Sequence, residues 1–241
     1  MKRSEEFNLA LSLLRDQVAG SHLLPGSYRK YQPLLADGLK FFLERLSSTR
    51  LKRILDEQLS LGFSVSIQKR VVALLHHVPA LHKLGQVVAR DRRLEAGFRK
   101  ELQRLESLEA RTPLDEVVAL LNTEFPDWQP RGIVLGPKPL AEGSVAVVMP
   151  FQWDPKQSPS PSGVFKLLKP GIKSLLDEDL EILGKLGDYL DEDCERYHLP
   201  PLDYRDTFDT IRDLLMHEVL LREEQEHLAW ASKFYASDPN V

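Results

Sequence analysis

Apolar residues recur at helical spacing through the first half of the chain. The run before the break at Leu24-Pro25-Gly26 and the run after it each place a stripe of apolar side chains on one helix face. Ser4 can cap the first helix and Gly20 can end it. Further helical segments are predicted over about 66–108, with interruptions, and over 112–121. The repeating positions are Phe7, Leu11, Leu14 and Val18 in the first run, and Leu35, Leu39, Phe42, Leu43 and Leu46 in the second.

The pattern changes between residues 126 and 171. Proline and glycine become frequent there, and two short runs rich in β-branched residues cover 144–148 and 163–168. Such runs are typical of strands, and the polar insert 153–162 between them predicts a long connecting loop. A pair of strands is therefore expected in this part of the chain.

The helical period returns after Ile172. Leucines then share one face up to residue 190, and another helix is predicted from about Tyr204 to Phe234. The order of these helices and strands along the chain predicts an α+β fold. A mainly helical N-terminal extension over 1–112 is followed by a small antiparallel β lobe with helices over 113–241. The leucines of the stripe are Leu176, Leu180, Leu183, Leu186 and Leu190.

The composition narrows the class of protein. Of the 241 residues, 42% are hydrophobic and 28% are charged, which fits a globular protein and is too apolar for a disordered one. The net charge of −4 gives no reason to expect a nucleic-acid partner. A single cysteine, Cys194, excludes an internal disulfide framework and fits a reducing compartment. With no run of about 18 apolar residues and no secretory signal at the start, a cytoplasmic location is expected.

Positive charge gathers between Arg29 and Arg53. Seven basic side chains lie there against Asp37 and Glu44, on helices with a strong apolar face. This composition allows peripheral contact with an anionic membrane surface. The solvated face of a helix that packs on a core is the more common reason for such a composition, and the sequence leaves both interpretations open.

Two Glu-x-x-His pairs raise the possibility of a metal site. The pairs are Glu195/His198 and Glu224/His227, and this spacing places both side chains of a pair on one side of a helix, as in di-iron bundles. The first pair is followed at once by Leu199-Pro200-Pro201, so it lies where a helix ends. No metal-binding site is therefore expected.

A series of short motifs follows in a fixed order over about two thirds of the chain. The order, more than any one motif, resembles the UbiB/AarF family of atypical protein-kinase-like proteins. The matching segments are Lys83-Leu84-Gly85-Gln86 (the K-x-G-Q signature), the amphipathic stretch 98–105, Pro139-Leu140-Ala141-Glu142-Gly143-Ser144-Val145, Val164-Phe165-Lys166, Lys169-Pro170-Gly171-Ile172, and Glu218-Val219-Leu220-Leu221-Arg222-Glu223-Glu224.

The resemblance implies a kinase-like N-lobe that binds ATP with Mg²⁺ in the complete protein, and a role connected to isoprenoid quinone lipids. Lys83 and Gln86 would form a polar pair on a helix across the nucleotide cleft, and Glu218 belongs to the matching acidic segment. In protein kinases a strand lysine held by a helix carboxylate reaches the phosphates, which makes Lys166 and Glu224 the candidate pair. The alternative for Lys166 is an ordinary strand lysine with its ammonium group in solvent.

The loop that would cover the phosphates is the alanine- and glycine-containing segment. Ala141, Gly143 and Ser144 have small side chains, so backbone N–H groups could approach a phosphate there. Glu142 does not fit this role, because a carboxylate beside the phosphates would repel them unless it points away.

Departures from the family pattern limit what the chain is expected to do. The family's E-x-D aspartate is Leu220 here, and His227 stands where the family has an asparagine. The sequence also stops where the family would enter its C-lobe, which supplies the magnesium ligands. We therefore expect the N-terminal part of a UbiB/AarF-like kinase or ATPase, binding nucleotide weakly at best and without turnover. The alternative is a non-catalytic pseudokinase remnant, or a helical module that binds a membrane or a partner.

Overall fold

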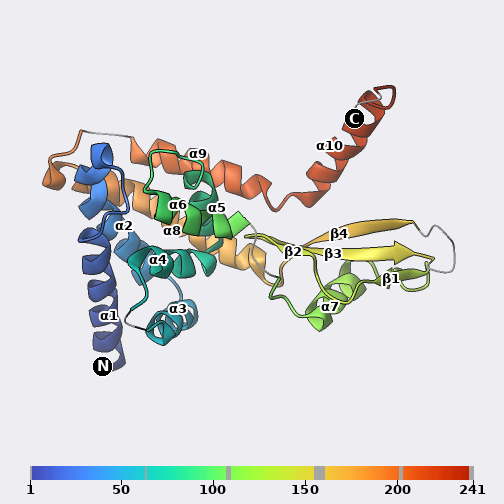
Figure 1. Ribbon diagram of the computed structural model, residues 1–241, viewed down its shortest axis with the longest axis horizontal. Helices are drawn as coiled ribbons and strands as arrows, with labels where there is room; N and C mark the ends of the chain where they lie inside the picture. The colour runs from blue at the N-terminus through green and yellow to red at the C-terminus, as the bar shows by residue number, and fades with distance from the viewer. Residues whose placement is uncertain (1, 63, 107–109, 155–160, 201–202, 239–241) are drawn as a thin grey trace.

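The computed structural model describes residues 2–62, 64–106, 110–154, 161–200 and 203–238, and it is an α+β protein as expected (Figure 1). A helical body occupies one side of the molecule and a small sheet with one covering helix occupies the other. The middle of the predicted loop, residues 155–160, lies outside the described residues. None of the described helices is long and apolar enough to cross a membrane.

The N-terminal helices form where the apolar stripes predict them. Leu11, Leu14 and Val18 are buried in the helical core. The segment predicted over 66–108 is three helices, of which the second begins with Pro79 at its first position. The elements are α1 (Lys2–Ala19), η1 (Gly26–Tyr31), α2 (Gln32–Glu44), α3 (Ser48–Ser60), α4 (Ile67–His76), α5 (Pro79–Val88), α6 (Ala96–Gln103) and η2 (Arg104–Glu106).

The two predicted strands pair as expected, and two shorter strands join them. All the pairings are antiparallel, with β1 and β2 sharing one edge of β3 while β4 takes the other. Helix α7 (Leu114–Glu124) covers the sheet by packing Val117 and Leu121 against Val147 and Met149. The strands are β1 (Ile133–Leu135), β2 (Ala141–Glu142), β3 (Ala146–Trp153) and β4 (Ser162–Leu168).

Helix α8 (Ile172–Asp193) follows the sheet and returns to the helical body. Its leucine stripe is buried in the same apolar cluster as the side chains of α1–α6, and it packs on α2, α5 and α9 (Tyr204–His217). A single cluster thus contains residues from both sides of the domain boundary expected at 112/113. The sheet has its own smaller clusters around Met149 and around Ile172.

The helix predicted from Tyr204 to Phe234 is two helices. It breaks at residues 218–220, and α10 (Leu221–Phe234) then leaves the body (Figure 1). Val219 packs against the cluster of Val145, Ala146 and Ile172, and Glu218 pairs with Lys83. These contacts hold the chain at the junction between body and sheet, and α10 buries none of its own side chains.

Candidate functional site

The predicted pair Lys166 and Glu224 meets in the structure. Lys166 is on β4, opposite Val148 of β3, and Glu224 is in the first turn of α10. The lysine Nζ lies 2.5 Å from the glutamate Oε2, although the residues are 58 positions apart in sequence. The fold therefore brings together the strand lysine and the helix carboxylate that the motif order selected.

Both members of this pair are accessible. Their side chains are 44% and 48% exposed. An exposed ion pair contributes about 1 kcal/mol or less, because water screens it and both side chains lose entropy. The contact is therefore too weak to fix α10 by itself, and the lysine can exchange its carboxylate partner for another anion.

The two polar residues of the K-x-G-Q helix have separate partners. Lys83 on α5 pairs with Glu218, with Nζ and Oε1 2.8 Å apart. Gln86 points elsewhere and donates from Nε2 to the carbonyl of Leu105 at 2.8 Å. The residues predicted as one polar pair thus do different things: the lysine reaches the segment after α9, and the glutamine ties α5 to η2.

Gly85, between them, has a packing role. A Cβ at this position would lie 2.8 Å from Leu105 Cδ1 and 3.0 Å from Leu75 Cδ1. Contacts this short are repulsive, so a larger residue would force the buried Leu105 and the Leu75 side chains to shift within the core. Close helix packing is one physical reason for the glycine of the signature.

His82 is the buried neighbour of Gln86, and sequence reasoning did not select it. It is 1% exposed, and its Nε2 lies 3.0 Å from the Leu105 carbonyl oxygen. Burial lowers the pKa of His82 to about 4, since the charged ring would lose its hydration. The imidazole is therefore neutral at pH 7 and supplies no positive charge to a phosphate.

The predicted phosphate loop is a tight turn between β2 and β3. Ala141 is exposed, whereas Ser144 is only 8% exposed. The N–H of Gly143 donates to the carbonyl of Ala146 at 2.8 Å. This amide is therefore used inside the turn and is not directed at a ligand.

The Glu142 side chain is buried and points away from the predicted phosphate loop. Its carboxylate would therefore not lie beside a phosphate bound there. Its Oε2 accepts from the backbone N–H groups of Arg111 and Thr112, at 2.6 and 2.9 Å, and Oε1 lies 2.7 Å from Lys169 Nζ. Burial opposes its charge, but the Lys169 ion pair and these N–H donors outweigh burial and lower the pKa of Glu142 to about 2. The carboxylate fastens the chain before α7 to the sheet.

A second buried charge cluster holds the start of α5. Arg50 of α3 lies 2.8 Å from Asp179 Oδ1 and 2.7 Å from Glu178 Oε2, both on α8. Asp179 is fully buried, and its Oδ2 accepts the N–H of Ala80 at 3.1 Å. It thus caps α5 from another helix. The sequence gives one signal for this buried charge, because Asp179 lies among the leucines of the apolar stripe of α8.

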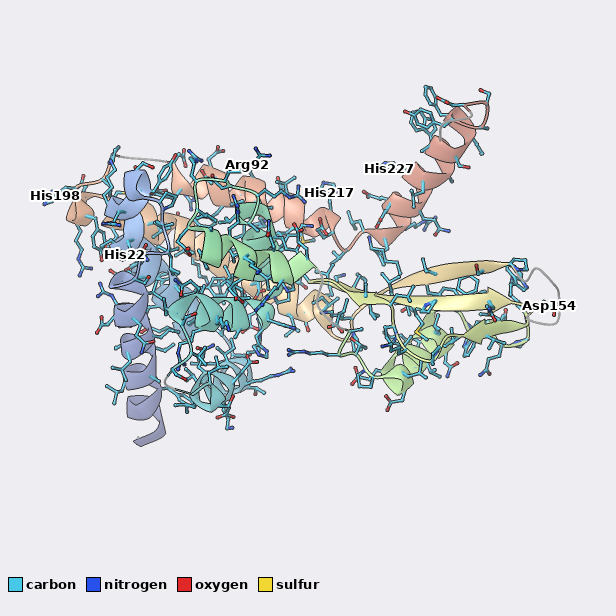
Figure 2. The ribbon with its side chains drawn as sticks, in the orientation of Figure 1. His22, Arg92, Asp154, His198, His217 and His227 are labelled. Atoms are coloured by element: carbon cyan, nitrogen blue, oxygen red, sulfur yellow. The ribbon has the colours of Figure 1, made fainter. Side chains whose placement is uncertain are left out.

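The two Glu-x-x-His pairs lie far apart. Figure 2 shows His198 at the outer end of the helical body and His227 on the projecting α10. Within the described part of the chain, no group of three or more His, Cys, Asp and Glu side chains is placed to hold a metal ion.

No protein-family model matches the chain, and no curated protein matches its sequence.

Proposed function

We propose that the β lobe forms part of a nucleotide-binding site, in which Lys166 contacts the phosphates and Glu224 positions the lysine. The main observation that supports this proposal is the ion pair between Lys166 on β4 and Glu224 on α10. The ordered motifs that resemble the UbiB/AarF family support the same function. In that family the site serves an atypical kinase or ATPase, and we extend to this chain the associated link with isoprenoid quinone lipids.

The residues present fit a nucleoside triphosphate in part. Lys166 offers an accessible cation, and Glu142 points inward and pairs with Lys169, so its negative charge is directed away from the loop. The Gly143 amide, in contrast, is already engaged within its turn. Mg²⁺ would neutralise phosphate charge in such chemistry. We assign no residue of the chain to the metal.

The proposal is tested by titrating the chain with Mg-ATP while following backbone amide signals by NMR. We expect weak, saturable shifts centred on β2–β4, and at least a tenfold loss of affinity in Lys166→Ala because the phosphate loses its cation. Lys185→Ala is the matched control, since Lys185 is an exposed lysine in a helix-surface ion pair with Glu181. It should bind like the unaltered chain.

Equal affinities in Lys166→Ala and Lys185→Ala would contradict the proposal, as would shifts that avoid β4. That result would favour the alternative of a non-catalytic module. The basic segment 29–53 supports membrane binding only partly, because Arg50 is turned inward and Lys40 and Lys52 have acidic neighbours in Glu44 and Asp56.

A further inference from the structure

An apolar cavity of about 430 Å³ lies inside the helical body, lined by residues of α1, α2, α4, α5, α6, α8 and α9. This volume lies within the roughly 300–1,000 Å³ that small-molecule sites occupy. Aliphatic and aromatic side chains line it almost entirely, so a ligand inside would be held through apolar area and not through hydrogen bonds. The lining includes Leu39, Phe42, Phe98, Leu102, Leu186 and Phe208.

The cavity reaches the surface between α2 and the end of α5. Leu35 and Val88 both line it, and they are 44% and 43% exposed. The residue before Val88, Val87, is 56% exposed and does not line the cavity. Exposing these apolar side chains to water at the opening is unfavourable in free energy. A bound apolar group would cover them and remove this unfavourable contribution.

Positive charge borders this opening. Tyr31 and Leu94 line the cavity, and the segments that carry them, 26–31 and 89–94, contain five basic residues and one acid. The segments lie side by side because Arg93 Nη1 donates to Tyr28 Oη at 2.8 Å, and the acid, Asp91, is paired with the same arginine. Figure 2 shows Arg92 at the outer surface of the helical body. The five are Arg29, Lys30, Arg90, Arg92 and Arg93, of which Arg90 lies 3.9 Å from Glu106 Oε1.

We propose that this cavity binds the hydrocarbon chain of a long-chain fatty acid, with the carboxylate at the basic border formed by segments 26–31 and 89–94. The apolar interior favours a hydrocarbon chain. The excess of arginine and lysine on the two bordering segments favours a ligand with an anionic head group over one with a neutral head group. The site is separate from the Lys166–Glu224 pair and does not depend on nucleotide binding.

Calorimetry with the sodium salts of straight-chain acids of about eight to fourteen carbons, kept below their micelle concentrations, tests the proposal. One acid should bind per chain, and each added methylene should tighten binding roughly fourfold until the cavity is full. Dodecanol should bind at least tenfold more weakly than dodecanoate. The combined Arg29→Gln, Lys30→Gln and Arg92→Gln variant should bind dodecanoate as weakly as it binds the alcohol.

Adjacent substitutions locate the site. Val88→Trp fills the opening and should lower dodecanoate affinity at least tenfold, whereas Val87→Trp adds the same surface outside the cavity and should leave it unchanged. Leu35→Trp closes the opposite wall and provides a second variant should Val88→Trp unfold. Thermal melting establishes that each variant is folded.

Three results would overturn the proposal. The first is an absence of saturable binding, and the second is an equal loss in Val87→Trp and Val88→Trp, which would place the acid elsewhere. The third is equal affinity for dodecanol and dodecanoate, which would point to a neutral chain such as an isoprenoid. None of these results bears on Mg-ATP binding at β4, which the Lys166 variants test separately.

Discussion

Glu142 shows how one buried carboxylate can connect two parts of a fold. It sits at the end of a two-residue strand, yet it binds the backbone ahead of α7 and the ammonium group of Lys169 after β4. Each of its contacts favours the ionised form. The carboxylate therefore contributes stability that depends on pH.

The expected dependence follows from the shift in pKa. Glu142 titrates near 4.5 in the unfolded chain and near 2 in the folded one, a difference worth about 3 kcal/mol. Because the folded pKa is the lower one, this stability is complete above pH 4.5 and is lost as the pH falls from 4.5 towards 2. Glu142→Gln should remove the dependence in this window and lower the free energy of unfolding at pH 7 by about 2–3 kcal/mol.

Urea unfolding between pH 2.5 and 7 measures this effect. Glu124→Gln, on the exposed end of α7, is the control and should change stability by less than about 0.5 kcal/mol. A Glu142→Gln protein as stable as the unaltered chain at pH 7 would show that the carboxylate does not fasten α7 to the sheet.

At the scale of elements, α8 is the helix that the other helices share. It packs on α2, α5 and α9, and Asp179 on its buried face caps α5. Two glycines lie one turn apart on it in different surroundings. A Cβ on Gly187 would lie 2.8 Å from Arg205 Cα of α9, whereas a Cβ on Gly184 would meet nothing within 4 Å.

The two glycines predict opposite effects of the same substitution. Gly184→Ala should raise the free energy of unfolding by about 0.5–1 kcal/mol, because alanine restricts the unfolded chain and favours helix. Gly187→Ala gains the same propensity but forces α9 away from α8, and should lower it by about 1–3 kcal/mol. Thermal or urea unfolding of the two variants provides the comparison. Stabilisation by both would mean that α8 and α9 are less closely packed than the structure shows.

At the scale of the whole molecule, α10 differs from the other long helices. It buries none of its side chains and keeps Leu228, Trp230 and Phe234 more than 60% exposed. Its described contact with the sheet is the exposed Lys166–Glu224 pair. Such a helix can open without disturbing the helical core.

Hydrogen exchange followed by mass spectrometry should therefore separate α10 from α8. Amides of α10 are expected to exchange at least a hundredfold faster than those in the middle of α8, because local opening of α10 exposes little apolar surface. Raising the salt concentration should quicken α10 further by screening its ion pair. Equal protection of the two helices would show that α10 is held by more than the Lys166–Glu224 ion pair.

The local pattern predicted much of the fold and part of the candidate site. The apolar stripes predicted α1, α2 and α8, and the β-branched runs predicted β3 and β4, because periodicity reflects which face of an element is buried. The motif order also selected Lys166 and Glu224 as partners, and the fold brings them to 2.5 Å. Their role in binding nucleotide stays a prediction.

Other features depend on contacts between distant segments, and only the tertiary structure decided them. Glu142 points inward because Lys169 and the chain at 111–112 meet there, and the break at 218–220 forms because Val219 and Glu218 find partners on other elements. The apolar cavity likewise forms only where residues of seven described α-helices come together. The sequence by itself determined which faces of α1 and α8 are buried, since their apolar residues repeat with the helical period, whereas the partners of each polar group depended on how the helices and the sheet packed together.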